Sequence, residues 1–103
     1  YVFEAVQRNV KTGTGRDVAV RLVRKPGGHP VAGAVILKTR LDMGPDNMAA
    51  MTSTVTPTAS SEPLIYRFKA DFTMAERWAL TLAAKVQGEP ETVKGTVEFQ
   101  ATE

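Results

Sequence analysis

Apolar residues recur at every second position along most of this chain, which is the spacing of a strand with one buried face. The run over residues 77–86 is the clearest, with Trp78, Leu80 and Leu82 in one phase and smaller or more polar residues between them. No segment has the sustained 3.6-residue apolar repeat of an amphipathic helix. The pattern therefore predicts an all-β protein.

Turns rich in glycine, proline or serine separate about seven such segments. Turns at this spacing are typical of an antiparallel β-sandwich of the immunoglobulin-like kind. A chain of 103 residues can build one hydrophobic core, and no linker divides it, so we expect a single domain over residues 1–103. The expected strands cover residues 1–7, 17–24, 31–41, 52–56, 64–70, 77–86 and 92–101.

Three local features are less regular than these strands. In the third expected strand, Val35 and Leu37 share a phase with Leu41 and are predicted to face the core. Residues 47–51 predict a single helical turn, because an acidic or amide side chain stands where it can cap the turn. The short, β-branched segment 52–56 predicts an edge strand.

The composition excludes several classes of function. There is no cysteine, which removes disulfides, thiolate metal sites and cysteine nucleophiles together. His29 is the only histidine, so no metal site can be built on a histidine pair, and we expect this side chain to be exposed at a hairpin tip. Glu89 and Glu91 flank a proline in a turn and are expected to be solvated. We find no catalytic constellation, and we therefore predict that the protein is not an enzyme and holds no organic cofactor.

The charge and the apolar runs limit the partners. The formal net charge of +2 comes from interspersed acidic and basic residues, and no basic run with interleaved aromatics predicts a nucleic-acid surface. The longest apolar stretches fall short of the roughly 20 residues that cross a bilayer, so we expect no direct membrane insertion. The sequence begins at Tyr1 rather than at methionine, and we expect that a signal peptide was removed or that the chain was trimmed.

Methionines supply the most distinctive candidate site. Met43, Met48 and Met51 place three of the four methionines within nine residues, and Met74 stands four residues before Trp78. Thioether sulfur is a soft, uncharged ligand that suits Cu(I) far better than Ca²⁺ or Mg²⁺. If the loops that carry these residues lie at one end of a sandwich, three or four thioethers converge on a Cu(I) or Ag(I) site. Methionine also fills irregular gaps in cores, and the sequence leaves both interpretations open.

Other side chains near the methionines could contribute to such a site. Trp78 or Phe72 would shield a bound ion, although Trp78 in a central strand is also expected to pin the core. Asp42, Asp46 and Asn47 offer oxygen ligands, but their spacing does not match a calcium-binding loop. Helix capping and turn stabilisation explain these three residues more simply.

Three segments together resemble the YtkA-like domain family, which includes proteins labelled FixH-like. They are Gly28–Ala34 followed by an extended run, Leu41–Met48, and Phe72–Leu80, with a Tyr66–Phe68 strand before the last. The resemblance covers roughly residues 14–101, although Glu76 stands where the family usually has glycine. It implies an exported, periplasmic immunoglobulin-like β-sandwich of the kind that accompanies heavy-metal efflux systems.

Two hypotheses of function follow from the residues and the resemblance. The first is a periplasmic module that binds Cu(I) or Ag(I) through Met43, Met48, Met51 and Met74 and passes it to an efflux-pump or membrane assembly partner. The second is a protein-interaction module without metal, which docks to a membrane transporter component by an edge strand or by its methionine loop. Methionine-rich surfaces adapt to apolar partners, so the same residues serve both hypotheses.

Overall fold

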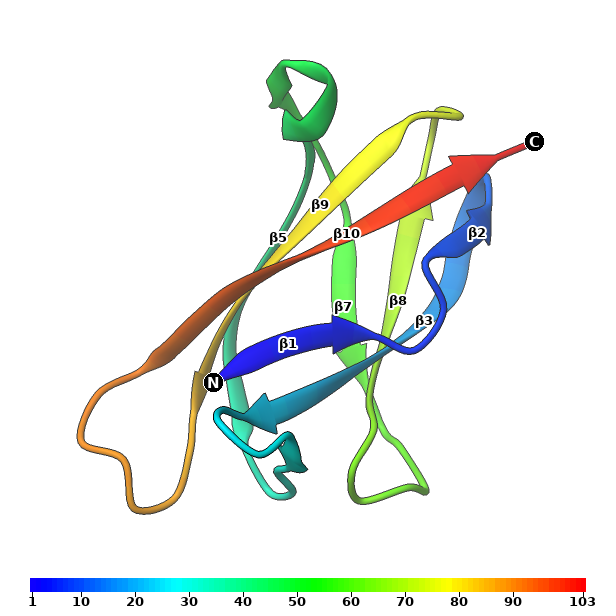
Figure 1. Cartoon of the computed structure of the whole chain (residues 1–103). Helices are drawn as coiled ribbons and strands as arrows, with labels where there is room; N and C mark the ends of the chain where they lie inside the picture. Colours follow the sequence, from blue (N-terminus) through cyan, green and yellow to red (C-terminus); the bar gives the residue numbers. More distant parts are fainter.

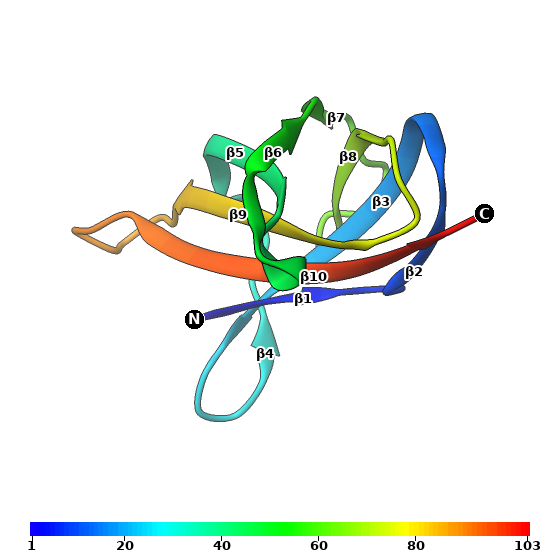
Figure 2. The same ribbon diagram turned by 90° about the horizontal axis from the view of Figure 1, so that it is seen from above.

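The computed structural model describes residues 1–103, apart from the side chain of Ala49. Two sheets face each other across one hydrophobic core (Figures 1 and 2), so the predicted all-β sandwich is confirmed. Within the described chain the elements are β1 (Val2–Ala5), β2 (Asn9–Lys11), β3 (Gly13–Arg24), β4 (His29–Pro30), β5 (Val35–Met43), the 3₁₀ turn η1 (Gly44–Asp46), β6 (Met48–Ser53), β7 (Val55–Thr58), β8 (Tyr66–Phe72), β9 (Arg77–Lys85) and β10 (Val93–Thr102).

The chain crosses between the sheets at five places. The first sheet has the order β1-β3-β8-β7, with β4 paired to β3, and the second has the order β2-β10-β9-β5-β6. The pair β2-β10 is parallel and the other pairs are antiparallel. The crossings therefore fall between β1 and β2, β2 and β3, β4 and β5, β6 and β7, and β8 and β9. All seven expected segments contribute strands, whereas the short strands β2 and β4 were not predicted.

Aromatic and aliphatic side chains from both sheets fill the space between them. Phe72 on β8 meets Trp78 on β9 at a ring-centroid distance of 6.0 Å and Phe99 on β10 at 6.1 Å, both edge to face. These are preferred geometries for aromatic pairs. The inward positions predicted from alternation in β9 are confirmed. The largest fully buried side chains are Trp78, Phe68, Phe72, Phe99, Leu22, Leu41, Met43, Leu80, Leu82 and Val20.

The predicted inward phase of β5 is wrong for its first half. Val35 is 59% exposed and Leu37 is 52% exposed, whereas Leu41 is 1% exposed. A β-bulge causes the change, because Ile36 pairs with Ala84 while Lys38 pairs with the adjacent Ala83, which leaves Leu37 as the extra residue. A bulge inserts one residue into the strand and so reverses which phase faces the core.

The predicted helical turn over residues 47–51 is also wrong. The helical turn comes earlier, at Gly44–Asp46, where Pro45 occupies a position that suits proline. Asn47 then adopts the left-handed conformation, with φ of 61°, and its backbone N–H donates to the Gly44 carbonyl at 2.9 Å. A left-handed residue ends a helix, and asparagine tolerates that conformation better than most residues. The following residues pair with β5 as the strand β6.

The predicted edge strand over residues 52–56 consists of two edge strands. Ser53 ends β6 at the edge of the second sheet, and Val55 begins β7 at the edge of the first sheet. Thr54 between them carries the chain from one layer to the other, and its carbonyl accepts the backbone N–H of Asp71 at 3.0 Å. The prediction that this segment lies at a sheet edge is confirmed. The change from one sheet to the other within the segment was not predicted.

Candidate functional site

Hydrogen bonds join two segments of the chain at one end of the sandwich. The segments are joined at two places, and we call each of these connections a tie. At the first tie, the Asp46 carboxylate accepts the backbone N–H of Arg77 at 2.8 Å and its Nε and Nη2 at 2.9 and 2.8 Å. At the second tie, Ser53 Oγ donates to the Asp71 carbonyl at 2.6 Å, beside the bond between Thr54 and Asp71. Residues 46–54 and 71–77 thus form two sides of one frame, which we call the methionine frame.

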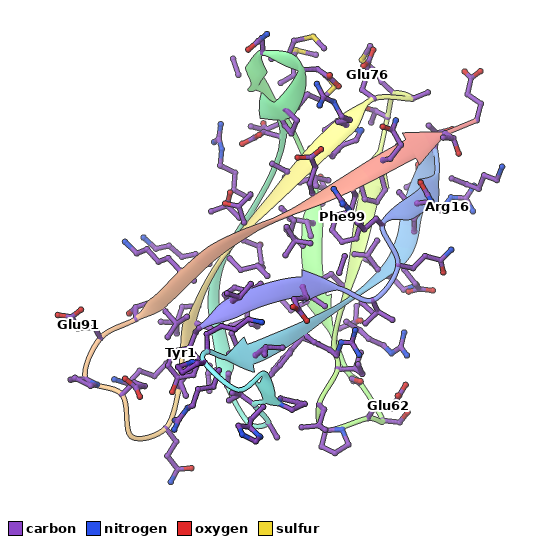
Figure 3. All side chains as sticks on the ribbon, in the orientation of Figure 1. Tyr1, Arg16, Glu62, Glu76, Glu91 and Phe99 are labelled. Carbon is purple, nitrogen blue, oxygen red and sulfur yellow. The ribbon has the colours of Figure 1, made fainter. Side chains whose placement is uncertain are left out.

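The frame lies at the upper end of the molecule in Figure 1, where η1 approaches the start of β9. Glu76 marks the same end in Figure 3. The loops that carry the methionines therefore lie at one end of the sandwich, which is the condition that the metal-site hypothesis requires. The sequence contains no local signal for the ties themselves, because Asp46 and Arg77 are separated by 31 positions.

Three of the four candidate methionines stand on this frame. Met48 and Met51 belong to its first side, where Met48 is partly buried against the core and Met51 is 51% exposed. Met74 belongs to the second side and is 42% exposed. Its carbonyl accepts Nε1–H of Trp78 at 3.1 Å and the backbone N–H of Glu76 at 3.0 Å, which fixes the loop backbone around the methionine.

Met43 occupies a different environment from the other three. It ends β5, pairs with Met48 across the strands and is 0% exposed within the core. The hypothesis that the methionine sulfurs converge on one site is therefore wrong for Met43, whose side chain is enclosed in the core. A signal in the sequence was available, because Met43 shares the phase of the buried Leu41 two residues earlier.

The aromatic side chains near the frame belong to the core. Trp78 is 1% exposed and Phe72 is 0% exposed, and the two rings meet edge to face. Trp78 therefore pins the core, as one prediction stated. Its contact with the frame is the hydrogen bond to the Met74 carbonyl.

The carboxylates of the methionine segment hold the backbone and arginines. Asp42 is 7% exposed and accepts Arg40 Nε and the backbone N–H of Gly44, each at 2.8 Å. The second bond is the local turn that aspartate side chains favour. The backbone N–H of Arg77, followed by its side-chain hydrogen bonds, lowers the pKa of Asp46 below its ordinary 3.8. These contacts support the predicted turn-stabilising role over a calcium site.

The lowered pKa of Asp46 makes the frame sensitive to acid. A carboxyl whose pKa is lowered by folding stabilises the folded state above its unfolded pKa, here 3.8, and the contribution is lost as the pH falls through the folded value. We therefore expect Asp46→Asn to lower the free energy of unfolding at neutral pH, and the difference from wild type to shrink progressively below pH 3.8. Urea unfolding across this pH range measures the difference.

Asp17→Asn is the matched control for that experiment. Asp17 pairs with Lys69 at 2.9 Å on an exposed surface, so its replacement removes the same charge outside the frame. Hydrogen exchange of residues 71–77 should accelerate in Asp46→Asn and stay unchanged in Asp17→Asn. A constant stability difference between Asp46→Asn and wild type at all pH values would contradict the assigned role of the carboxylate.

Two other candidate residues lie away from the frame. His29 is exposed in β4, beside the turn that follows β3, as expected. Glu89 is not a freely solvated carboxylate, because it accepts Tyr1 Oη at 2.9 Å and pairs with Arg24 at 3.9 Å. Arg24 also lies over the Tyr1 ring, 5.4 Å from its centroid. This cluster ties the first residue to the turn between β9 and β10, and the expected solvation holds only for the exposed Glu91.

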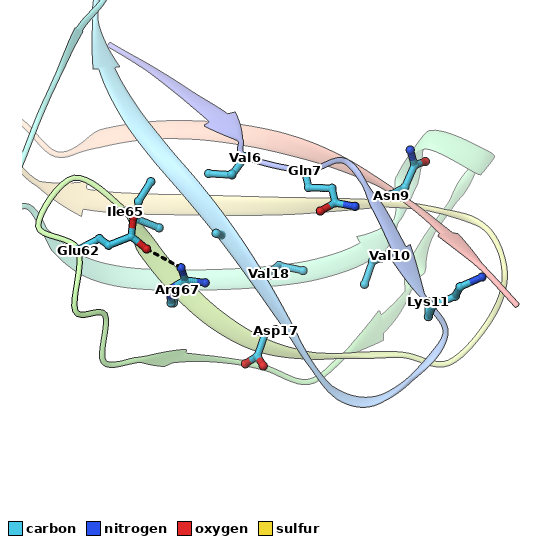
Figure 4. A pocket seen from close by; sticks show the side chains of 11 residues that line it. Val6, Gln7, Asn9, Val10, Lys11, Asp17, Val18, Glu62, Ile65 and Arg67 are labelled. Atoms are coloured by element: carbon cyan, nitrogen blue, oxygen red, sulfur yellow. Dashed lines mark hydrogen bonds and ion pairs between the residues drawn. The ribbon is translucent and has the colours of Figure 1, made fainter.

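A hollow of about 440 Å³ opens between β2, β3 and the segment before β8 (Figure 4). Val10 and Val18 contribute apolar surface to it, and Glu62 and Arg67 form an ion pair of 2.8 Å at one side. The charged groups that border the hollow therefore already neutralise each other in part. It lies on different elements from the methionine frame.

The donor types available in the described residues bear on any metal site. No group of three or more histidine, cysteine, aspartate or glutamate side chains is arranged to hold a metal ion in that part of the chain. The thioethers of the frame are a separate, softer set of donors. In the same described residues, no helix has the length and apolarity needed to span a bilayer.

Comparison with known families assigns the chain. The model of the YtkA-like family matches residues 1–83, which is most of the 103-residue sequence, so the chain belongs to the YtkA-like family. The match includes both sides of the methionine frame and ends within β9. No curated protein sequence matches the chain. The family and the fold together describe an accessory type of β-sandwich domain.

Proposed function

Because the chain is a YtkA-like domain with three methionines on one frame, we propose that it binds Cu(I) or Ag(I) through Met48, Met51 and Met74. The observation that carries the proposal is the pair of ties, Asp46 to Arg77 and Ser53 to Asp71. They join both ends of two segments that are distant in sequence, and two thioethers belong to one segment and one to the other. A site whose backbone is already ordered loses less entropy when it binds its ligand.

The burial of the three side chains suits a site that exchanges its ion. Met48 is partly buried and anchored against the core, while Met51 and Met74 are 51% and 42% exposed and accessible to a partner. Neutral sulfurs favour Cu(I) and Ag(I) over hard cations without adding charge. Met43, at 0% exposure, is left out of the ligand set. The proposed role is a periplasmic carrier that passes the ion to a heavy-metal efflux or assembly protein.

A competition titration against a chromophoric Cu(I) chelator, under reducing conditions, tests the proposal. Wild type is expected to take up one equivalent of Cu(I). The triple variant Met48→Leu, Met51→Leu and Met74→Leu should bind at least about tenfold more weakly, or about 1.4 kcal/mol. Leucine keeps the apolar volume and removes the sulfur.

Met43→Leu is the matched control, because it removes one sulfur from the core and none from the frame. Its Cu(I) affinity is expected to equal that of wild type. Equal affinities of wild type and the triple variant would overturn the proposal.

A second candidate function is a docking module without metal. The half-exposed Met51 and Met74, together with the edge strand β6, favour it, because flexible methionines adapt to apolar partners and edge strands can pair with another chain. In that case the triple leucine variant would keep much of the partner binding, since leucine preserves the apolar surface. The two functions therefore differ in their response to the same variant.

A further inference from the structure

The outer face of the second sheet carries two lysines, one on each side of a small residue. Lys38 on β5 and Lys94 on β10 are both paired in register with Ala83 on the central strand β9. Two strand spacings of about 4.8 Å separate the lysine backbones. Ala83 is 8% exposed and is paired on both sides within the sheet.

Both lysine ammonium groups are free to meet an anion. Neither Lys38 nor Lys94 has a hydrogen bond or ion pair with another described residue, and both side chains are exposed. The next row of the same face adds a cation, because Arg40 pairs in register with Thr81, although its Nε already donates to Asp42. Lys85 lies two residues beyond Ala83 on β9 and donates to the Glu89 carbonyl at 2.7 Å. Positive charge thus gathers at this end of the face.

The surface between the two lysines is hollowed. Depressions of about 240 and 420 Å³ adjoin there, and Lys38, Ala83 and Lys94 line both. Leu82 and Thr81 contribute to the smaller one, and the bulged Leu37 to the larger one, which Glu91 also borders. A concave strip with apolar floor and cationic sides fits an inserted chain better than it fits the flat plane of lipid headgroups.

We infer that this strip binds an extended acidic peptide segment of a partner protein, with its backbone over Ala83. Successive side chains of an extended peptide point to opposite sides. Two adjacent acidic residues in the partner therefore send one carboxylate toward Lys38 and the other toward Lys94. This site is separate from the methionine frame and does not depend on metal binding.

Fluorescence anisotropy tests the inference. The labelled peptide carries a central Glu-Glu pair, which is flanked by glycines and a leucine. Wild type is expected to bind this peptide and to bind the Gln-Gln version at least about tenfold more weakly. The double variant Lys38→Gln and Lys94→Gln should lose at least about tenfold in affinity. Ala83→Leu, which changes no charge but fills the floor, should weaken binding as well.

Lys11→Gln with Lys25→Gln is the matched control, because it removes two exposed positive charges from other surfaces. This control should retain wild-type affinity. An equal loss in both double variants would show non-specific attraction and overturn the inference, as would the absence of binding by wild type. Binding to phosphatidylglycerol vesicles in place of the peptide would overturn it in favour of a membrane surface.

Discussion

Replacement of Trp78 by alanine is expected to lower the free energy of unfolding by about 3–5 kcal/mol. The side chain is 1% exposed, contacts the Phe72 ring edge to face and lies between the two sheets. Its removal leaves a cavity that the surrounding β-strands cannot fill without moving. Domains of this size are commonly stable by about 5–15 kcal/mol, so the loss is a large share of the total. Urea unfolding followed by circular dichroism measures it.

Trp78→Phe separates the packing of this residue from its hydrogen bond. Phenylalanine retains an aromatic ring but cannot donate to the Met74 carbonyl, which Trp78 Nε1–H reaches at 3.1 Å. We expect a smaller loss of stability than in Trp78→Ala, together with faster hydrogen exchange in residues 73–76. A loss below about 1 kcal/mol for Trp78→Ala would contradict the central position of this side chain in the core.

Replacement of Met43 by alanine is expected to cost about 2–5 kcal/mol, because the side chain is 0% exposed and its loss opens a cavity. Met51→Ala is expected to change the stability by no more than about 0.5 kcal/mol, since that side chain is 51% exposed. The comparison distinguishes a methionine that packs from one that is available for binding. Both values come from the same denaturant titration.

Met43→Leu supplies the control for size. A similar apolar volume in the same position should cost less than about 1.5 kcal/mol. If Met43→Ala were as mild as Met51→Ala, the side chain would have to be more accessible than its burial in β5 indicates.

The regular strands were predictable because their alternation is uninterrupted. In β9, Trp78, Leu80 and Leu82 face the core at the positions that period two predicts. The phase of β5 could not be found in the same way. Its bulge at Leu37 is defined by pairing with β9, a partner far along the chain, and one inserted residue reverses the pattern.

The turn after β5 shows a different kind of error. Proline, aspartate and asparagine correctly predicted a turn at residues 45–47. The direction of the chain after this turn depends on the backbone conformation of one residue. Asn47 has a φ of 61°, which ends the helical turn, and the residues that follow it pair with β5. The change of sheet at Thr54 similarly depends on tertiary contacts, because its carbonyl bonds to Asp71.

The candidate site was predictable in its location and less so in its membership. The sequence placed the methionine-rich segment and the loop with Met74 at one end, and the Asp46–Arg77 tie now explains why they stay together. Met43 was included because it is close in sequence to Met48. Its phase with Leu41, two residues earlier, indicated that β5 directs its side chain inward.

The central claim is that Met48, Met51 and Met74 act together as thioether ligands. Titration of Ag(I) into protein labelled with ¹³C at the methionine methyl groups tests it directly, because all four methionines give separate signals in one spectrum. We predict that the signals of Met48, Met51 and Met74 shift together and saturate at one equivalent, while that of Met43 stays in place. Unchanged signals from the three frame methionines, or shifts that never saturate, would contradict the account.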